Sequence, residues 1–194
     1  MKRERGMKKK EILNAVIFLA VTVLCLTACG KEKPEKGVQT PGTIADNVYL
    51  SGDGAFTVRA EERLWNTDVE KNGGESALYL KDEENVWISF DRAEGITKQM
   101  TASFEDSFVN GYMEGIKEYY PDAREQDSLQ LNGNLARLDM TMTSDTGDYE
   151  MYQILYLASD GANGYIITST IRKEEAERIK PLIYQVVESI EFVN

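Results

Sequence analysis

The segment from Tyr149 to Ala158 constrains the fold most, because its apolar side chains fall on both sides of an extended chain. Three apolar residues share one parity and three share the other: Tyr152, Ile154 and Tyr156, and Met151, Leu155 and Leu157. Successive side chains of a strand point to opposite faces of its sheet. We therefore expect this strand at the centre of a sheet that is covered on both faces.

Short turns join this segment to other strand-like segments before and after it. Alternating or β-branched apolar residues bounded by Asn, Asp, Gly and Ser are typical of antiparallel strands. The predicted strands are Val48 to Ser51, Ala55 to Ala60, Ala77 to Lys81, Val86 to Phe90, Ser128 to Leu131, Leu135 to Thr143 and Tyr165 to Ile171. The second half of the chain is thus predicted to be an antiparallel meander.

A first helix is predicted from about Ser103 to Tyr119, with Ser103 and Asp106 as a capping-box-like start and Pro121 beyond its end. Its predicted buried stripe is Phe104, Phe108, Tyr112, Ile116 and Tyr119. Gly111 and Gly115 fall on the same side, which predicts a close approach of the helix backbone to the sheet.

A second helix is predicted from about Lys173 to Glu188. Apolar residues at helical spacing form one stripe, consisting of Ala176, Ile179, Ile183, Val186 and Ile190. The residues from Ser189 to Val193 then predict a short edge strand.

This order of elements resembles the PsbP-like fold. The resemblance spans about residues 47–194 and rests on the order of elements, a Leu-Asn-Gly-Asn turn at 131–134, a Tyr-Ile-Ile-Thr strand at 165–168 and a closing helix that runs into Ser-Ile-Glu-Phe at 189–192. It implies an α+β class in which an antiparallel sheet is flanked by helices on both faces. The superfamily has no shared catalytic residues, and its known members mostly bind other proteins.

The N-terminus has the pattern of a secretory signal peptide. Lysine and arginine residues are frequent up to Lys10, and an apolar run follows from Ile12 to Ala28. A membrane-spanning helix is the alternative, but these residues are at the short limit for crossing about 30 Å of hydrocarbon. Met7 is an alternative initiator to Met1, since the lysines after it would supply the positive end.

The five residues Leu26 to Gly30, Leu-Thr-Ala-Cys-Gly, resemble the lipobox of bacterial lipoproteins. This resemblance implies that a diacylglyceryl group is attached to the thiol of Cys29 and that cleavage occurs just before it. A diacylglyceryl group supplies the two chains that stable anchoring needs. The resemblance therefore predicts a palmitate-type lipid anchor and a place on the extracytoplasmic face of the cell membrane, at the surface of a Gram-positive cell.

Three regions follow from these patterns. Residues 1–28 are the predicted signal peptide, and residues 29–46 are the predicted lipidated cysteine with a flexible tether, because this stretch is charged and holds two of the four prolines. Residues 47–194 are the predicted globular domain, which is long enough for one core.

Composition excludes several function classes. The chain has no histidine, and its two cysteines are Cys29 and Cys25, which lies in the predicted leader. Imidazole bases, Ser-His-Asp triads, nitrogen ligands for zinc and cysteine nucleophiles are therefore excluded from the mature chain. After removal of residues 1–28 the chain has 16 basic and 31 acidic residues, a net charge of −15, which disfavours nucleic acid as a partner.

Three kinds of site are considered. Val109, Met113 and Tyr120 widen the apolar arc of the first helix and form a candidate partner surface, unless other parts of the chain cover them. Acidic turns at 82–85, at 145–150 and at Asp160 with Asn163 are candidate calcium sites, although none matches an EF-hand and solvated turns are the favoured interpretation. A pair of carboxylates acting on a glycoside is the third, least favoured possibility.

We therefore predict a non-catalytic binding module, without a cofactor or a metal ion, that is held on the membrane through Cys29 and engages another envelope protein through a sheet edge or the first helix. The alternative is a lipoprotein that binds a small molecule or Ca²⁺, and a hydrolase is the least favoured hypothesis.

Overall fold

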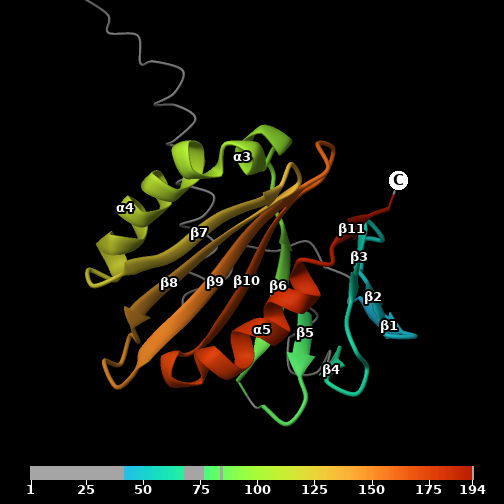
Figure 1. Cartoon of the computed structure of the whole chain (residues 1–194), viewed down its shortest axis with the longest axis horizontal. Coiled ribbons are helices and arrows are strands. Elements are labelled where there is room, and N and C mark those ends of the chain that lie inside the picture. The colour runs from blue at the N-terminus through green and yellow to red at the C-terminus, as the bar shows by residue number, and fades with distance from the viewer. Residues whose placement is uncertain (1–41, 68–76, 84, 194) are drawn as a thin grey trace, which may run out of the picture.

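The computed structural model describes residues 42–67, 77–83 and 85–193, which form two antiparallel sheets (Figure 1). The larger sheet has seven strands in the order β4-β5-β6-β10-β9-β8-β7. Its strands are β4 (Trp65–Asn66), β5 (Ala77–Leu80), β6 (Trp87–Arg92), β7 (Arg124–Asn132), β8 (Leu135–Thr143), β9 (Glu150–Ser159) and β10 (Gly164–Arg172). Six of these strands follow segments that the sequence predicts, and β4 is the one that it does not predict.

A smaller sheet of four strands has the order β1-β2-β3-β11. Its strands are β1 (Thr43–Ala45), β2 (Val48–Leu50), β3 (Phe56–Arg59) and β11 (Glu191–Phe192). The sequence predicts β2, β3 and the edge position of β11, but it does not predict that they form a separate sheet. The strand β1 lies inside the segment expected to be a tether, so regular structure begins before residue 47.

The strand β9 confirms the prediction from its two-sided apolar pattern. It pairs with β8 on one side and with β10 on the other. Tyr152, Ile154 and Tyr156 join one core cluster, whereas Leu155 and Leu157 join a second cluster. Alternation along one strand therefore separates two cores.

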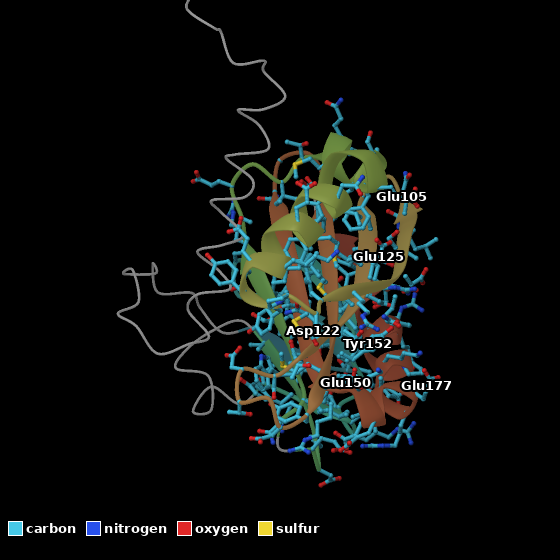
Figure 2. The ribbon with its side chains drawn as sticks, turned by 90° about the vertical axis from the view of Figure 1, so that its left-hand side faces the viewer. Glu105, Asp122, Glu125, Glu150, Tyr152 and Glu177 are labelled. Carbon is cyan, nitrogen blue, oxygen red and sulfur yellow. The ribbon has the colours of Figure 1, made fainter. Side chains whose placement is uncertain are left out.

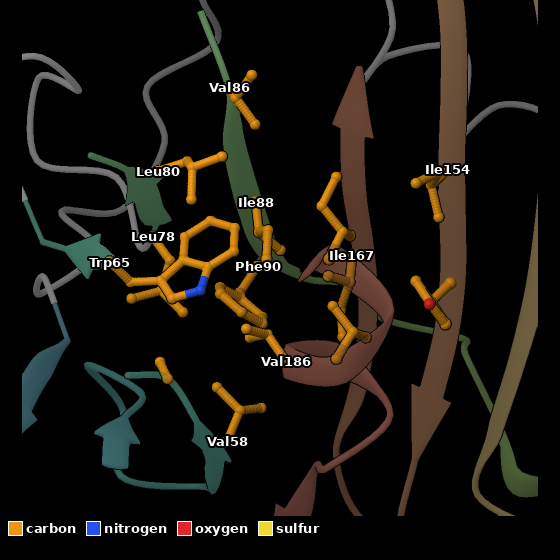
Figure 3. Close-up of a cluster of buried hydrophobic side chains, with 14 of the residues drawn as sticks. Val58, Trp65, Leu78, Leu80, Val86, Ile88, Phe90, Ile154, Ile167 and Val186 are labelled. Atoms are coloured by element: carbon orange, nitrogen blue, oxygen red, sulfur yellow. The ribbon is translucent and has the colours of Figure 1, made fainter. Parts of the chain in front are cut away.

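The first cluster lies between the larger sheet, the smaller sheet and the C-terminal helix α5 (Ala176–Val187). The predicted apolar stripe of α5 is confirmed, since Ala176, Ile179, Ile183 and Val186 are buried in this cluster. Figure 3 shows Trp65 beside Leu78 and Leu80, and Val186 near Phe90 and Ile167. We call the side of the larger sheet that contacts this cluster the α5 face.

The second cluster joins the opposite side of the larger sheet, here called the α4 face, to a broken helical segment. That segment consists of α3 (Lys98–Ala102), the π-helical turn η1 (Glu105–Val109) and α4 (Asn110–Tyr119). Phe104, Phe108 and Tyr112 stack in series, with ring centroids 5.4 and 5.3 Å apart. Figure 1 shows α3 and α4 along one end of the sheet, away from α5.

Three predictions for this helical segment are wrong. The helix begins after Thr97, whose side chain accepts a hydrogen bond from the backbone N–H of Met100, and Ser103 ends α3 instead of capping a helix start. Tyr119 is exposed in the last turn of α4, whereas Tyr120 beside it packs against the second cluster. The close approach predicted for Gly111 and Gly115 is wrong for Gly111, which is exposed and where a side chain would meet no atom within 4 Å, whereas Gly115 is buried.

The α+β class with antiparallel sheets is confirmed. Among the described residues no helix has the length and apolar character needed to cross a membrane. The predicted signal peptide, Cys29 and most of the predicted tether lie outside the described residues.

Candidate functional site

A polar cluster lies on the α5 face of β8, beside Tyr152, Ile154 and Tyr156 of the neighbouring strand β9. Arg137 and Asp139 are two residues apart in β8, so both side chains point toward α5. Asp139 is 1% exposed and Arg137 is 8% exposed. Charged side chains are rarely buried to this extent unless they are paired, and both residues have several partners.

Arg137 forms ion pairs with carboxylates from three parts of the fold. Its guanidinium lies 2.9 Å from Asp127 in β7, 3.4 Å from Asp139 in the same strand and 2.7 Å from Glu188, which follows α5. The guanidinium also stacks on the ring of Tyr184 in α5, 4.0 Å from its centroid. We call Arg137 and these three carboxylates the Arg137 cluster.

Asp139 is held by two tyrosines. The hydroxyls of Tyr184 and Tyr152 both donate to its Oδ2, the latter over 3.2 Å. Its other oxygen, Oδ1, is buried and has no hydrogen-bond partner in the part of the chain that the structure describes. Oδ2 of Asp139 therefore accepts two hydrogen bonds, whereas Oδ1 accepts none from the described residues.

Burial raises the pKa of Asp139 above its usual value, although the hydrogen bond from Tyr184 and the charge of Arg137 oppose this change. The negative charge of Asp127 raises the pKa of Asp139 further. Burial and the nearby Asp139 carboxylate also raise the pKa of Tyr152 to about 12. The pKa of Arg137 is raised as well, because the attraction of Asp139 and the other acidic partners outweighs the effect of burial.

A carboxyl group with a raised pKa is a candidate general acid, but it needs contact with a substrate. Asp139 lies beneath α5 and is closed to solvent. The contacts of the Arg137 cluster instead attach the end of α5 and the strand β7 to β8. The Arg137 cluster therefore holds α5 and β7 in position against β8.

The most open part of the larger sheet is its edge strand β7, which lies at one end of the strand order (Figure 1). Seven of its nine residues are exposed. Within the described part of the chain β7 pairs with β8 alone, so its outer backbone groups face away from the sheet. Its register against β8 shifts twice, between Glu125 and Asp127 and between Gln130 and Asn132.

Acidic side chains surround this edge. Figure 2 looks at this side of the molecule and labels Glu105, Asp122, Glu125, Glu150 and Glu177. The carboxylate of Asp122 accepts hydrogen bonds from the backbone N–H and the hydroxyl of Thr143, at 3.0 and 2.6 Å. The hydrogen bond from the hydroxyl of Thr143 lowers the pKa of Asp122 below its usual value.

The three residues predicted as a partner surface lie in the interior. Val109 and Met113 are 4% and 7% exposed and belong to the second cluster, and Tyr120 is partly buried against it. The π-helical turn explains the difference, because it takes more residues per turn than an α-helix and so rotates the following residues. Val109 and Met113 therefore face the sheet and are buried between the sheet and the helix.

The acidic turns predicted as calcium candidates are used within the protein. Asp160 accepts hydrogen bonds from the backbone N–H groups of Ala162 and Asn163, at 2.8 and 2.7 Å. Glu83 pairs with Arg178 and Glu150 pairs with Lys173. No group of three or more acidic or cysteine side chains suited to a metal ion is found within the described ranges.

Sequence reasoning missed the Arg137 cluster, although a signal for it was present. The strand from Leu135 to Thr143 has charged residues at positions 137 and 139, two apart on one side, in a segment that is otherwise apolar or hydroxylated. Charges on one face of an inner strand indicate buried ion pairs. Their partners in β7 and after α5 are too far away in sequence to be predicted from that pattern.

The fold is similar to that of the Ran-binding protein Mog1p of Saccharomyces cerevisiae. The TM-score is 0.50 at 10% sequence identity, over 78% of this chain and 97% of Mog1p. This similarity shows a shared fold and does not show a shared activity.

Two further solved structures match with lower TM-scores. One is the cyanobacterial PsbP protein CyanoP of Synechocystis sp. PCC 6803, with a TM-score of 0.43 at 11% identity over 86% of this chain and 99% of CyanoP. The other is LpqN of Mycobacterium tuberculosis, described as involved in cell envelope biogenesis, with 0.35 at 10% identity over 79% and 82%. No protein-family model and no curated protein sequence matches the chain.

Proposed function

We propose that this protein is a lipid-anchored, extracytoplasmic binding module with a PsbP-like sandwich fold, and that its partner is another protein of the cell envelope. The apolar run up to Ala28 and the lipobox-like residues around Cys29 support the anchor. The shared fold with Mog1p, a Ran-binding protein, shows that this architecture serves protein binding in at least one other case.

The observation that carries the proposal is the free edge of β7. A strand with unpaired backbone N–H and C=O groups is a template for pairing with a strand from another chain. β7 is nine residues long and exposed at seven positions. In the described part of the chain, the strands at the other sheet edges (β4, β1 and β11) have only two or three residues each.

We further propose that the module is not an enzyme. The acidic residue whose pKa is raised, Asp139, is closed to solvent beneath α5, so a substrate cannot reach it without movement of that helix. The exposed surface near β7 provides hydrogen-bonding backbone and carboxylates, which suit recognition of another protein.

Photo-crosslinking in living cells tests this function. A photoreactive residue is introduced at exposed β7 positions, Glu125 and Gln130, and at Leu50 in the smaller sheet. We expect one dominant envelope protein, identified by mass spectrometry, to be crosslinked from the β7 positions. Background labelling from every position would exclude the binding function.

Mass spectrometry of the native protein tests the anchor separately. We expect a diacylglyceryl group on Cys29 and no residues before it. A chain that retains its first 28 residues and an unmodified thiol would exclude the proposed anchoring.

A further inference from the structure

The regular part of the free edge is short. The two register shifts of β7 leave Asp127, Ser128, Leu129 and Gln130 in continuous pairing with β8, opposite Asp139, Leu138, Arg137 and Ala136. Bulges interrupt a ladder and twist a strand away from neighbours. The bulges on either side therefore limit any added strand to about these four residues.

One exposed apolar side chain marks this stretch. Leu129 is 43% exposed and lies on the α5 face, since it pairs with Arg137. Asp127 lies two residues earlier on the same face, because its partner in β8 is Asp139. An apolar group and a carboxylate thus stand side by side along one face of the edge.

The surroundings of Asp127 carry an excess of negative charge. One guanidinium, that of Arg137, is shared by the carboxylates of Asp127, Asp139 and Glu188. The two cations of α5 have other partners: Lys180 lies over the ring of Tyr152 and pairs with Glu177, and Arg178 pairs with Glu83 and Glu175. The side chain of Asp127 is 55% exposed, so a second cation can approach it from solvent.

We propose that the stretch from Asp127 to Gln130 pairs with an extended segment of the partner protein that carries a basic residue and an apolar residue two positions apart. The basic side chain lies against Asp127, and the apolar side chain covers Leu129. Directly opposed side chains on paired strands share a face, so two residues of the bound segment with one residue between them meet both groups. This inference rests on the proposed binding function and names the chemistry of the partner segment.

The charges of the edge give the pairing its selectivity. Glu125 stands at one end of the stretch beside the exposed Arg124, and the carboxylate of Asp122 lies just before the strand. An acidic strand is repelled there, and a neutral strand is not attracted. A second copy of this acidic chain is also repelled. The edge therefore favours a basic segment over pairing with itself.

Selection from a displayed library of random nonapeptides tests the inference, with the purified full chain in detergent as the target. We expect enriched peptides to share a basic and an apolar residue separated by one residue. We expect Leu129→Lys to weaken the binding of an enriched peptide about tenfold or more, because a lysine at this edge repels the basic residue and removes the apolar contact.

The matched control is Leu50→Lys, because Leu50 is 41% exposed on a strand of the other sheet. It should leave the binding of the peptide within about twofold of the unchanged chain. Circular dichroism confirms that both variants are folded.

Three results would overturn the inference: no enriched peptide, a consensus without a basic residue, or equal losses for Leu129→Lys and Leu50→Lys. If photo-crosslinking from the β7 positions still identifies an envelope protein in those cases, the binding function stands and only the proposed chemistry of the partner segment fails. If crosslinking also returns background, both proposals fail.

Discussion

The two faces of the larger sheet are covered in different ways, although both are formed by the same strands. On the α4 face, β8 and β9 contribute apolar side chains: Leu138, Met140, Met142, Leu155 and Leu157. On the α5 face the same two strands contribute Arg137, Asp139, Tyr152 and Tyr156 beside purely apolar residues. One face is an apolar interface, and the other combines an apolar core with buried ion pairs.

The difference shows how each cover is held in place. Apolar contacts are non-directional and depend on area and close packing. Ion pairs and hydrogen bonds to a buried group depend on direction, and removing one partner leaves the others unpaired. The end of α5 and the edge strand β7 are both attached to β8 through such directional contacts at Arg137. The proposed binding edge is therefore positioned by the α5 face.

The largest effect is expected for a core change on the α4 face. Phe108→Ala should destabilise the protein by about 3 to 5 kcal/mol, because Phe108 is buried between the rings of Phe104 and Tyr112. Urea unfolding measured by fluorescence gives the change in free energy. Tyr119→Ala in the same helical segment is the control and should cost less than about 0.5 kcal/mol, because Tyr119 is 47% exposed. Equal losses would show that α4 is not held by its buried rings.

The next effect concerns the cation of the α5 face. Arg137→Met should destabilise the protein by about 3 kcal/mol, since it leaves Asp139 buried without a counterion while two other partners reach solvent. Arg178→Met is the matched control, because Arg178 also pairs with two carboxylates but is largely exposed. Its loss should be much smaller, because ion pairs of an exposed side chain are screened by water and contribute little to stability. If the Arg137 variant were as stable as the unchanged chain, the directional attachment of α5 and β7 would be wrong.

A change in pH should separate buried from exposed carboxylates. The pKa of Asp139 is raised above 3.8, so the folded state binds a proton at a pH where the unfolded chain does not. Its contribution to the free energy of unfolding should therefore grow as the pH falls toward about 4. Asp139→Asn should remove this gain, as measured by urea unfolding at a series of pH values.

Asp53 provides the opposite case. Burial would raise its pKa, but hydrogen bonds from Tyr165, Ser51 and the backbone lower it below 3.8 overall. Its contribution to stability is present above that value and is lost as the pH falls through the lowered pKa. Asp53→Asn should thus change the pH dependence only below about 4. The same pH dependence in both variants would contradict the assigned directions.

Local pattern was sufficient for the longer strands, because period-two alternation reports burial directly, but the short strands β1 and β4 were not predicted. The central place of β9 and the apolar stripe of α5 are confirmed for that reason. The break in the first helix was not predictable from period alone, since a π-helical turn changes the period itself. Val109 and Met113 were consequently considered as a candidate partner surface unless other parts of the chain covered them, and in the structure both are buried against the sheet.

Contacts between segments that are far apart in the chain also could not be predicted from the sequence. The Arg137 cluster joins residues 127, 137 and 188, and nothing local indicates which carboxylate meets which cation. The smaller sheet could not be predicted for the same reason, because β11 at the C-terminus pairs with β3 near the other end of the domain. Cys29 and the leader lie outside the described residues, so their predicted roles rest on the sequence.

The smallest expected change in stability tests how α4 packs against the α4 face of the sheet. Gly111 and Gly115 were predicted to bring the helix backbone close to the sheet, yet Gly111 is exposed and a Cβ there meets no atom within 4 Å. Gly111→Ala should therefore stabilise the protein by about 0.5 to 1 kcal/mol in urea unfolding, since alanine restricts the unfolded chain and favours helix. Gly164→Ala should instead destabilise it, because a Cβ at that position lies 2.5 Å from the backbone oxygen of Ile96. A loss of stability in the Gly111 variant would mean that α4 packs against the sheet through its glycines, and then the two faces of the sheet would differ less than their side chains indicate.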